Sequence, residues 1–162
     1  MTMSYPKTTV TAPGDRELVI QRVFDAPREL VFRAYTDPEA LVRWWGPREW
    51  TTEVRSMDVR PGGTWHYVMR GPGGEEAWGI ATYREVVPPE RLVYTDAFSD
   101  AEGSTVPPEM EITVIFEDQG GKTLLSSTTL FASTEERQQV IEMGVVEGMG
   151  QTLDRLDEYL AS

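Results

Sequence analysis

The sequence lacks cysteine altogether and contains a single histidine, His66. The absence of cysteine excludes a thiol nucleophile, a thiolate zinc site and a disulfide framework. One histidine cannot build a His-rich metal site, and it argues against a Ser-His-Asp triad. We therefore expect no metal and no other cofactor, and the pattern assigns no catalytic residue.

Basic residues and long apolar runs are also scarce. There are 15 Lys and Arg against 27 Asp and Glu, for a net charge of −12. Such a chain is poorly suited to nonspecific binding of nucleic acid or of anionic membranes, which needs clustered positive charge. No apolar run approaches the ~20 residues of a membrane-spanning helix, and the first fifteen residues lack the apolar centre of a signal peptide. We expect a cytoplasmic protein without membrane insertion and without a nucleic-acid partner.

The length of 162 residues suits one domain. Residues 1–15 are polar and contain Pro and Gly, which predicts a flexible N-terminal tail before a single domain at residues 16–162. Glu17–Phe24 alternates in the manner of a strand. A short helix is expected at residues 27–35, with Pro in its first turn, and a second one starts at Asp37-Pro38-Glu39.

Beyond Trp50 the apolar period becomes two, and Gly- and Pro-rich turns separate the apolar segments. The predicted strands are residues 50–59, 64–70, 77–87, 91–98, 109–117 and 123–131. Most of the gaps are short, which favours an antiparallel meander. Residues 99–108 form the longest loop, and we expect it to be the most mobile one.

The last segment, residues 133–160, predicts one long amphipathic helix with a weakened middle. Ser133 and Glu136 form a capping box at its start. Its middle contains Met143, Gly144, Gly148, Met149 and Gly150. Each helix-interior Gly costs roughly 0.5–1 kcal/mol relative to Ala. Either the helix packs closely on a sheet there, or it covers a cavity with the flexible methionines as lining.

The order of elements is strand, two short helices, six strands and a long helix, an α+β pattern. By analogy with known folds, we expect a helix-grip fold. A curved seven-stranded antiparallel sheet would surround the long C-terminal helix, with the two short helices after the first strand closing one end. Folds of this kind tend to leave a space between sheet and helix.

Alternation along the strands indicates which side chains would line that space. Trp65, Tyr67 and Met69 share one face of their strand, opposite His66. In the last strand, Ser127 and Thr129 lie on the otherwise apolar face of Leu125 and Phe131, and Met110 begins a similar apolar face in the strand before. The two hydroxyls either bond each other across strands or face something polar in a cavity.

Two tryptophan positions leave alternatives open. Trp44 and Trp45 diverge by about 100° on a helix, so only one of them can face the core squarely. Trp78 lies among the small residues Ala77, Gly79 and Ala81. These either leave room beside a large ring or mark a β-bulge at the glycine.

Some charged side chains are expected near the cavity, although no two are placed as an acid–base pair. They are Glu53, Arg70, Asp96 and Glu147. Glu147 borders the inward face of the last helix, or else is a solvated flank. His66, on the outward face of its strand, is expected at the surface or locally hydrogen-bonded, with an acid–base role as the alternative.

Four segments, taken together, resemble the SRPBCC (START-like) superfamily. They are RVFDAPRELVFRAYTDPEALVRWWGP, DVRPGGTWHYVMR, YREVVPPERLVYTD and EGMGQTLDRLDEYL. More narrowly, the chain is similar to the branch related to the C-terminal domain of the activator of heat-shock-protein-90 ATPase, over residues 17–160. The resemblance implies a helix-grip fold with a deep hydrophobic cavity, and binding of lipids, polyketides or other apolar molecules in some relatives. The family has no universal catalytic residue, and where it commonly has Gly-Trp this chain has Gly148-Met149.

Three functional hypotheses follow. The leading one is binding of an apolar, lipid-like, aromatic or polyketide-like small molecule by a monomer or homodimer. The residues expected to line the site are Trp44, Trp45, Trp65, Tyr67, Met69, Trp78, Met110, Ser127, Thr129, Phe131, Met143, Glu147 and Met149. The second is an enzyme of cyclase or hydrolase type, which needs Asp96, Glu147 or His66 inside the cavity. The third is a chaperone-interacting module.

Overall fold

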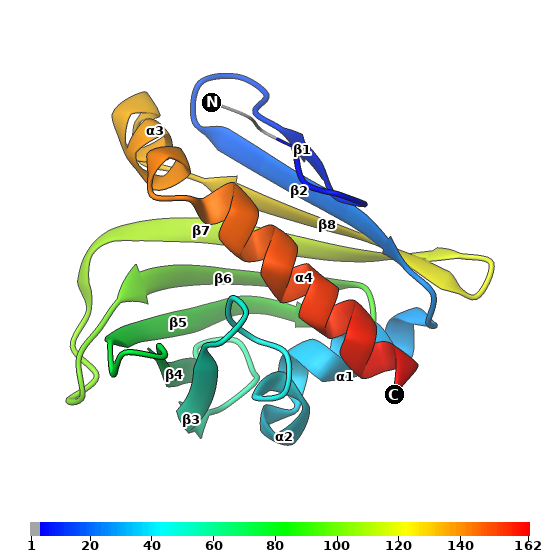
Figure 1. The fold of residues 1–162 in the computed structure, drawn as a ribbon, viewed down its shortest axis with the longest axis horizontal. Coiled ribbons are helices and arrows are strands. Elements are labelled where there is room, and N and C mark those ends of the chain that lie inside the picture. Colours follow the sequence, from blue (N-terminus) through cyan, green and yellow to red (C-terminus); the bar gives the residue numbers. More distant parts are fainter. Residues whose placement is uncertain (1–3) are drawn as a thin grey trace.

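The computed structural model describes residues 4–162, which form one antiparallel sheet and four helices (Figure 1). The strands are β1 Thr9–Thr11, β2 Glu17–Phe24, β3 Thr51–Met57, β4 Thr64–Arg70, β5 Glu76–Val87, β6 Arg91–Phe98, β7 Val106–Gln119 and β8 Lys122–Leu130. The helices are α1 Arg28–Thr36, α2 Pro38–Leu41, α3 Thr134–Glu142 and α4 Val145–Ala161. This is the predicted α+β helix-grip architecture.

The strand order is β1-β2-β8-β7-β6-β5-β4-β3. Six strands therefore form the expected meander, and β2 joins its far end by pairing with β8, with Ile20 opposite Ser127. The sheet has eight strands rather than the predicted seven. The additional strand, β1, lies in the segment expected to be a tail, where Val10 pairs with Ile20 of β2.

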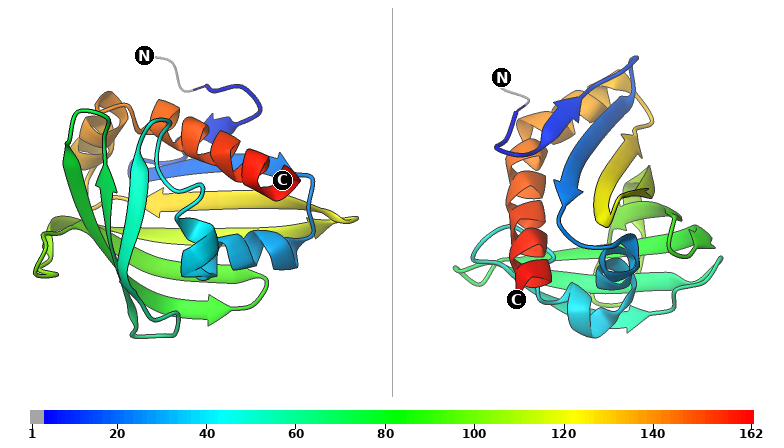
Figure 2. Two further views of the ribbon diagram at one scale, coloured as in Figure 1. Left: turned by 60° about the horizontal axis from the view of Figure 1, so that its bottom comes forward. Right: turned by 90° about the vertical axis from the view of Figure 1, so that its right-hand side faces the viewer.

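The curved sheet wraps around α4, which crosses it diagonally, while α1 and α2 lie at one end (Figures 1 and 2). Leu153 and Leu156 of α4 are fully buried against the sheet. The guanidinium of Arg22, also buried, donates to Asp154 at 2.5 Å and to Asp157 at 3.4 Å. The helix is thus held by burial of its leucines in the core and by ion pairs with Arg22 of β2.

The prediction of one uninterrupted helix over residues 133–160 is wrong, because the segment forms two helices, α3 and α4, with a turn between them. Gly144 has φ +92°, in the left-handed region that favours glycine. The backbone N–H of Met143 ends α3 by donating to Gln139. At the other end half of the predicted capping box is present: Ser133 accepts from the Glu136 N–H, but the Glu136 carboxylate accepts from the Ala132 N–H instead of the Ser133 N–H.

The glycines of α4 have different surroundings. A Cβ on Gly150 would overlap the ring of Tyr5, which packs on this side of the helix and donates its hydroxyl to Asp154 at 2.9 Å. A Cβ on Gly148 would lie 3.8 Å from Pro47, an ordinary contact. Close packing therefore explains Gly150, whereas Gly148 lies next to the cavity described below.

Candidate functional site

Two adjoining cavities lie between the sheet and the last two helices. The inner cavity has a volume of about 120 Å³ and the outer cavity about 350 Å³. Both are lined by Trp45, Asp96, Met110, Val140, Val145 and Met149. The shared residues place the two cavities side by side.

The inner cavity is largely apolar. Leu18, Ile20, Ile112 and Phe131 contribute to its wall. Ser127 and Thr129 also line it, and within residues 4–162 no hydrogen bond joins the two hydroxyls to each other. Of the two alternatives for these hydroxyls, the geometry therefore favours the one in which they face a cavity.

Most of the residues expected from the sequence are brought together here. Those that line one or both cavities are Trp45, Tyr67, Met69, Met110, Ser127, Thr129, Phe131, Met143 and Met149. They come from the α2–β3 loop, β4, β7, β8 and the α3–α4 region. That these side chains contact a ligand stays a prediction.

Two of the expected tryptophans are buried beneath the cavity walls. Trp44 is fully buried and donates its indole N–H to the Ala34 carbonyl at 3.0 Å, which leaves Trp45 as the member of the pair that faces the cavity. Trp65 stacks on Tyr67, with ring centroids 4.4 Å apart, and Trp45 packs edge-on at 5.0 Å. These neighbours cover Trp65, so it supports the lining without reaching the cavity.

Trp78 and Glu147 lie outside the cavities, contrary to the expectation. Trp78 is on the outer face of β5, where its ring lies 5.3 Å from His66 and beneath the guanidinium of Arg55. Glu147 is exposed on α4 and accepts a hydrogen bond from Gln151. Glu147 therefore lies on the solvated flank of the helix, the second of the two positions considered for it from the sequence.

The small residues around Trp78 make room for a different ring. Gly79 pairs with Tyr67 across β4 and β5, and a Cβ on this glycine would lie 2.5 Å from the phenol Cζ and Oη atoms. The ring of Tyr67 therefore lies across β5, and its hydroxyl reaches Asp96 Oδ1 of β6 at 3.5 Å. Glycine at position 79 is what allows these two polar groups to approach each other.

Asp96 is the acidic residue of the cavities, and it lines both of them. Burial raises the pKa of its carboxyl to about 7, although the hydrogen bonds from Tyr67 and from the Ala97 backbone oppose that shift. Burial also raises the pKa values of Tyr67 and Tyr94 well above 10, so both phenols are neutral.

Of the three residues considered for chemistry, only Asp96 reaches a cavity. The imidazole Nε2 of His66 lies 2.7 Å from the Asp100 carbonyl, on the outer face of the sheet, as expected for a locally bonded histidine. The other two charged candidates, Glu53 and Arg70, form an exposed ion pair there with Nη1–Oε1 at 2.8 Å. Acid–base chemistry in the cavities would thus rest on Asp96.

The lining also includes residues that the sequence interpretation missed. Tyr94 could have been found, because it alternates with Asp96 on β6 and so shares its inward face. Tyr35 of α1, Val140 of α3 and Val145 of α4 could not, since their positions depend on how the helices dock.

The outer cavity opens beside the α2–β3 loop, where Gly46 and Pro47 face Gly148 and the exposed Met143. Arg155 of α4 holds this loop. Its Nη1 lies within hydrogen-bonding distance of several carbonyls, those of Trp45, Gly46, Pro47 and Trp50, at 2.9–3.3 Å. One side chain therefore fixes the loop that carries Trp45.

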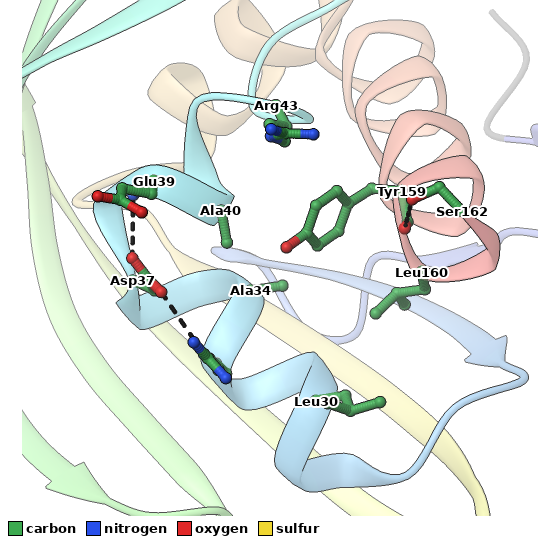
Figure 3. A pocket seen from close by; sticks show the side chains of 10 residues that line it. Leu30, Ala34, Asp37, Glu39, Ala40, Arg43, Tyr159, Leu160 and Ser162 are labelled. Atoms are coloured by element: carbon green, nitrogen blue, oxygen red, sulfur yellow. Dashed lines mark hydrogen bonds and ion pairs between the residues drawn. The ribbon is translucent and has the colours of Figure 1, made fainter.

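A larger surface hollow of about 510 Å³ lies between α1, α2 and the end of α4 (Figure 3). Part of its polar lining is paired internally: Arg33 pairs with Asp37 at 3.5 Å, and Asp37 accepts from the Glu39 N–H at 3.0 Å. The latter bond confirms Asp37 as the N-cap of α2. Because charged side chains line much of it, this hollow suits a hydrophobic molecule less well than the largely apolar cavities under α4.

Over the described residues 4–162, no group of three His, Asp or Glu side chains is placed to hold a metal ion. In the same part of the chain, no helix combines the length and hydrophobicity needed to cross a membrane.

Comparison with known proteins shows similarity along nearly the whole chain. Residues 25–161 match the family described as Activator of Hsp90 ATPase homolog 1-like protein. Protein Ms6760 from Mycobacterium smegmatis is 31% identical, with a TM-score of 0.83, over 93% of this chain and 96% of that one. A protein from Arthrobacter aurescens is 30% identical, with a TM-score of 0.89, over 94% and 91%. One from Staphylococcus epidermidis is 33% identical, with a TM-score of 0.84, over 94% and 93%. None of the curated proteins matches the chain.

Proposed function

Because the chain belongs to the family of Activator of Hsp90 ATPase homolog 1-like proteins, we propose that it binds a hydrophobic small molecule in the inner and outer cavities. The observation that carries this proposal is the largely apolar lining, interrupted by a few convergent polar groups. Such a division of labour is typical of small-molecule sites, in which apolar walls give affinity and polar groups set orientation.

Met149 is the position at which to test the proposal, since its flexible side chain lines both cavities. Met149→Trp places a bulky ring where the two cavities meet. We expect the wild-type protein to enhance the fluorescence of the neutral apolar probe N-phenyl-1-naphthylamine, and the variant to lose about tenfold or more in affinity because the space is filled.

The matched control is Val23→Trp, which adds the same ring at an exposed position on β2 away from the cavities. Both variants are compared by thermal unfolding to establish that they fold. Equal probe affinity of Met149→Trp and Val23→Trp would contradict binding in these cavities. Absence of probe binding to wild type, also after screening lipids and polyketides by thermal shift, would contradict the function itself.

One observation favours a second candidate, an enzyme of cyclase or hydrolase type. Asp96 has a carboxyl with a pKa near neutrality inside the cavity, and Tyr67 lies beside it. A group whose pKa lies near the working pH is suited to proton transfer. Hydrolysis of 4-nitrophenyl esters that is saturable and lost in Asp96→Asn would support this candidate, and equal rates in both proteins would count against it.

A further inference from the structure

The charge of the cavities has one source. Among the described residues that line them there is no Lys, Arg or His, and Asp96 is the only ionisable carboxyl. The remaining polar groups are hydroxyls and the indole N–H of Trp45, and the hydroxyl of Thr152 already donates to the Gly148 carbonyl at 2.8 Å. Among residues 4–162, the lining thus provides no cation to neutralise the carboxylate of Asp96.

Asp96 also has unused hydrogen-bonding capacity. A carboxylate can accept about four hydrogen bonds. Its partners here are the Tyr67 hydroxyl, at the long distance of 3.5 Å, and the backbone of Ala97. A donor bound in the cavity would therefore find free lone pairs on a carboxylate that is otherwise poorly solvated.

Aromatic side chains surround the same space. Trp45 packs against both Tyr67 and Tyr35, with ring centroids 6.3 Å apart in each pair, and Tyr94 precedes Asp96 on the inward face of β6. Aromatic rings attract a cation through their quadrupole, and more strongly when the cation is desolvated. A carboxylate among several aromatic rings is thus a suitable environment for an ammonium group.

We propose that the hydrophobic ligand is an amine, whose ammonium group pairs with Asp96 beside Trp45 and Tyr67 while its apolar body lies along Met110, Val140 and Met149. This inference rests on the proposed function and specifies its ligand class. The overall charge of −12 attracts a cationic ligand and repels an anionic one at long range. A fatty-acid carboxylate would instead meet Asp96 as a like charge.

Proton release provides a signature of this pairing. The groups that face Asp96 from β4, β6 and α1 are the phenols of Tyr67, Tyr94 and Tyr35, whose pKa values burial raises. From α3, α4, β7 and β8 the lining carries no titratable group. At about pH 6 Asp96 is mostly protonated in the free protein, so binding of an ammonium ion expels close to one proton.

The test uses three probes that share a naphthalene ring: 1-naphthylmethylamine, 1-naphthalenemethanol and 1-naphthoate. Titration calorimetry on the full chain at about pH 8 should show the amine binding about tenfold or more tightly than the alcohol, and the carboxylate most weakly. At about pH 6, in two buffers of different ionisation enthalpy, only the amine should release a proton. Asp96→Asn should lower the affinity for the amine to that of the alcohol or below it, because the ammonium group then has no counter-ion in the cavity.

The outcomes separate the two proposals. If the amine and the alcohol bind equally, or the amine binds without releasing a proton, the amine inference is overturned while hydrophobic binding stands. If none of the three probes binds, nor N-phenyl-1-naphthylamine, both proposals fail together. The proton measurement needs only the wild-type protein, so the inference stays falsifiable even when Asp96→Asn does not fold. Glu147→Gln, which removes an exposed carboxylate of α4 outside the cavities, should retain the preference for the amine.

Discussion

Asp96 makes the stability of this protein depend on pH in a direction unusual for a carboxyl. Its pKa rises from 3.8 to about 7 on folding because the group is buried, so between these values the folded state binds more protons than the unfolded state. Stability from this group is therefore fully present below about pH 4 and is lost as the pH rises through about 7. The ionised carboxylate is tolerated, but at a cost to folding.

Asp96→Asn removes this dependence while keeping the shape of the side chain. Since each unit of pKa corresponds to ~1.4 kcal/mol, a rise from 3.8 to about 7 corresponds to ~4 kcal/mol, and we expect the variant to be more stable than wild type at about pH 8 by on the order of that amount. At about pH 4 the two free energies of unfolding should be nearly equal. Urea denaturation at both pH values measures the difference, and a gap that does not change with pH would contradict the assignment.

Residue by residue, the strand faces could be predicted from the sequence and the helix-dependent contacts could not. Alternation by two correctly placed Tyr67, Ser127 and Thr129 on inward faces. The same rule, applied to β5, should have placed Trp78 outside, because it alternates with Gly79 and Ala81, both of which are buried. The expectation that Trp78 lines the cavity was based on its large ring among small residues, and it disregarded the alternation of side chains along the strand.

Among the elements, α4 and the break before it contain three glycines within seven residues, and these glycines have three different structural roles. The break had a signal in the sequence, because a helix commonly ends at a glycine in the left-handed conformation. Gly144 has that conformation, Gly148 is helical beside the cavity mouth, and Gly150 packs on Tyr5. Replacing each of these glycines separately with alanine therefore distinguishes effects of backbone conformation, helix propensity and packing.

Gly148→Ala should stabilise the protein by about 0.5–1 kcal/mol through helix propensity, since its Cβ meets only an ordinary contact with Pro47. Gly144→Ala should cost about 1 kcal/mol or more, because alanine disfavours a φ of +92° although open space surrounds it. Gly150→Ala should also destabilise, by displacing the ring of Tyr5. Chemical denaturation of the three variants measures these effects, and a stabilising Gly144→Ala would contradict the observed break.

Removing the phenol ring of Tyr5 provides a control for the explanation that Gly150→Ala destabilises the protein through a packing clash. In a Tyr5→Ala background the obstacle at position 150 is gone, so Gly150→Ala should no longer destabilise and should gain helix propensity. If the cost of Gly150→Ala persisted there, contact with Tyr5 would not be its cause.

At the scale of the whole molecule, the cavities exist because α4 is fastened to the sheet by residues that no local pattern could pair. Arg22 and Asp154 are 132 positions apart in sequence, and Tyr5 and Asp154 are 149 apart. The period-two and capping signals are local, and they correctly predicted the order of the elements from β2 to β8, but not β1 or the break between α3 and α4. How far α4 lies from the sheet, and hence the size of the cavities, depends on these long-range contacts.

Asp154 should give the molecule its acid sensitivity, in the opposite direction to Asp96. Burial opposes ionisation of its carboxyl, but hydrogen bonds from Arg22 and Tyr5 outweigh that cost, so its pKa is lowered. Stability from a lowered pKa is present above the unfolded value of about 4 and is lost as the pH falls. We expect Asp154→Asn to lower the free energy of unfolding by about 3 kcal/mol at neutral pH, since it leaves the buried charge of Arg22 without its nearest partner.

The matched control is Glu158→Gln, on the same helix, whose ion pair with Arg48 is exposed on both sides. Its carboxyl also has a lowered pKa, through the hydrogen bond from Arg48, but a surface pair contributes only ~0–1 kcal/mol. Urea denaturation between about pH 3 and 7 should therefore show a reduced loss on acidification in Asp154→Asn and a profile close to wild type in Glu158→Gln. If both variants followed the wild-type profile, the Arg22–Asp154 pair would not be what fastens α4, and the cavity beneath it would have to be maintained by apolar packing alone.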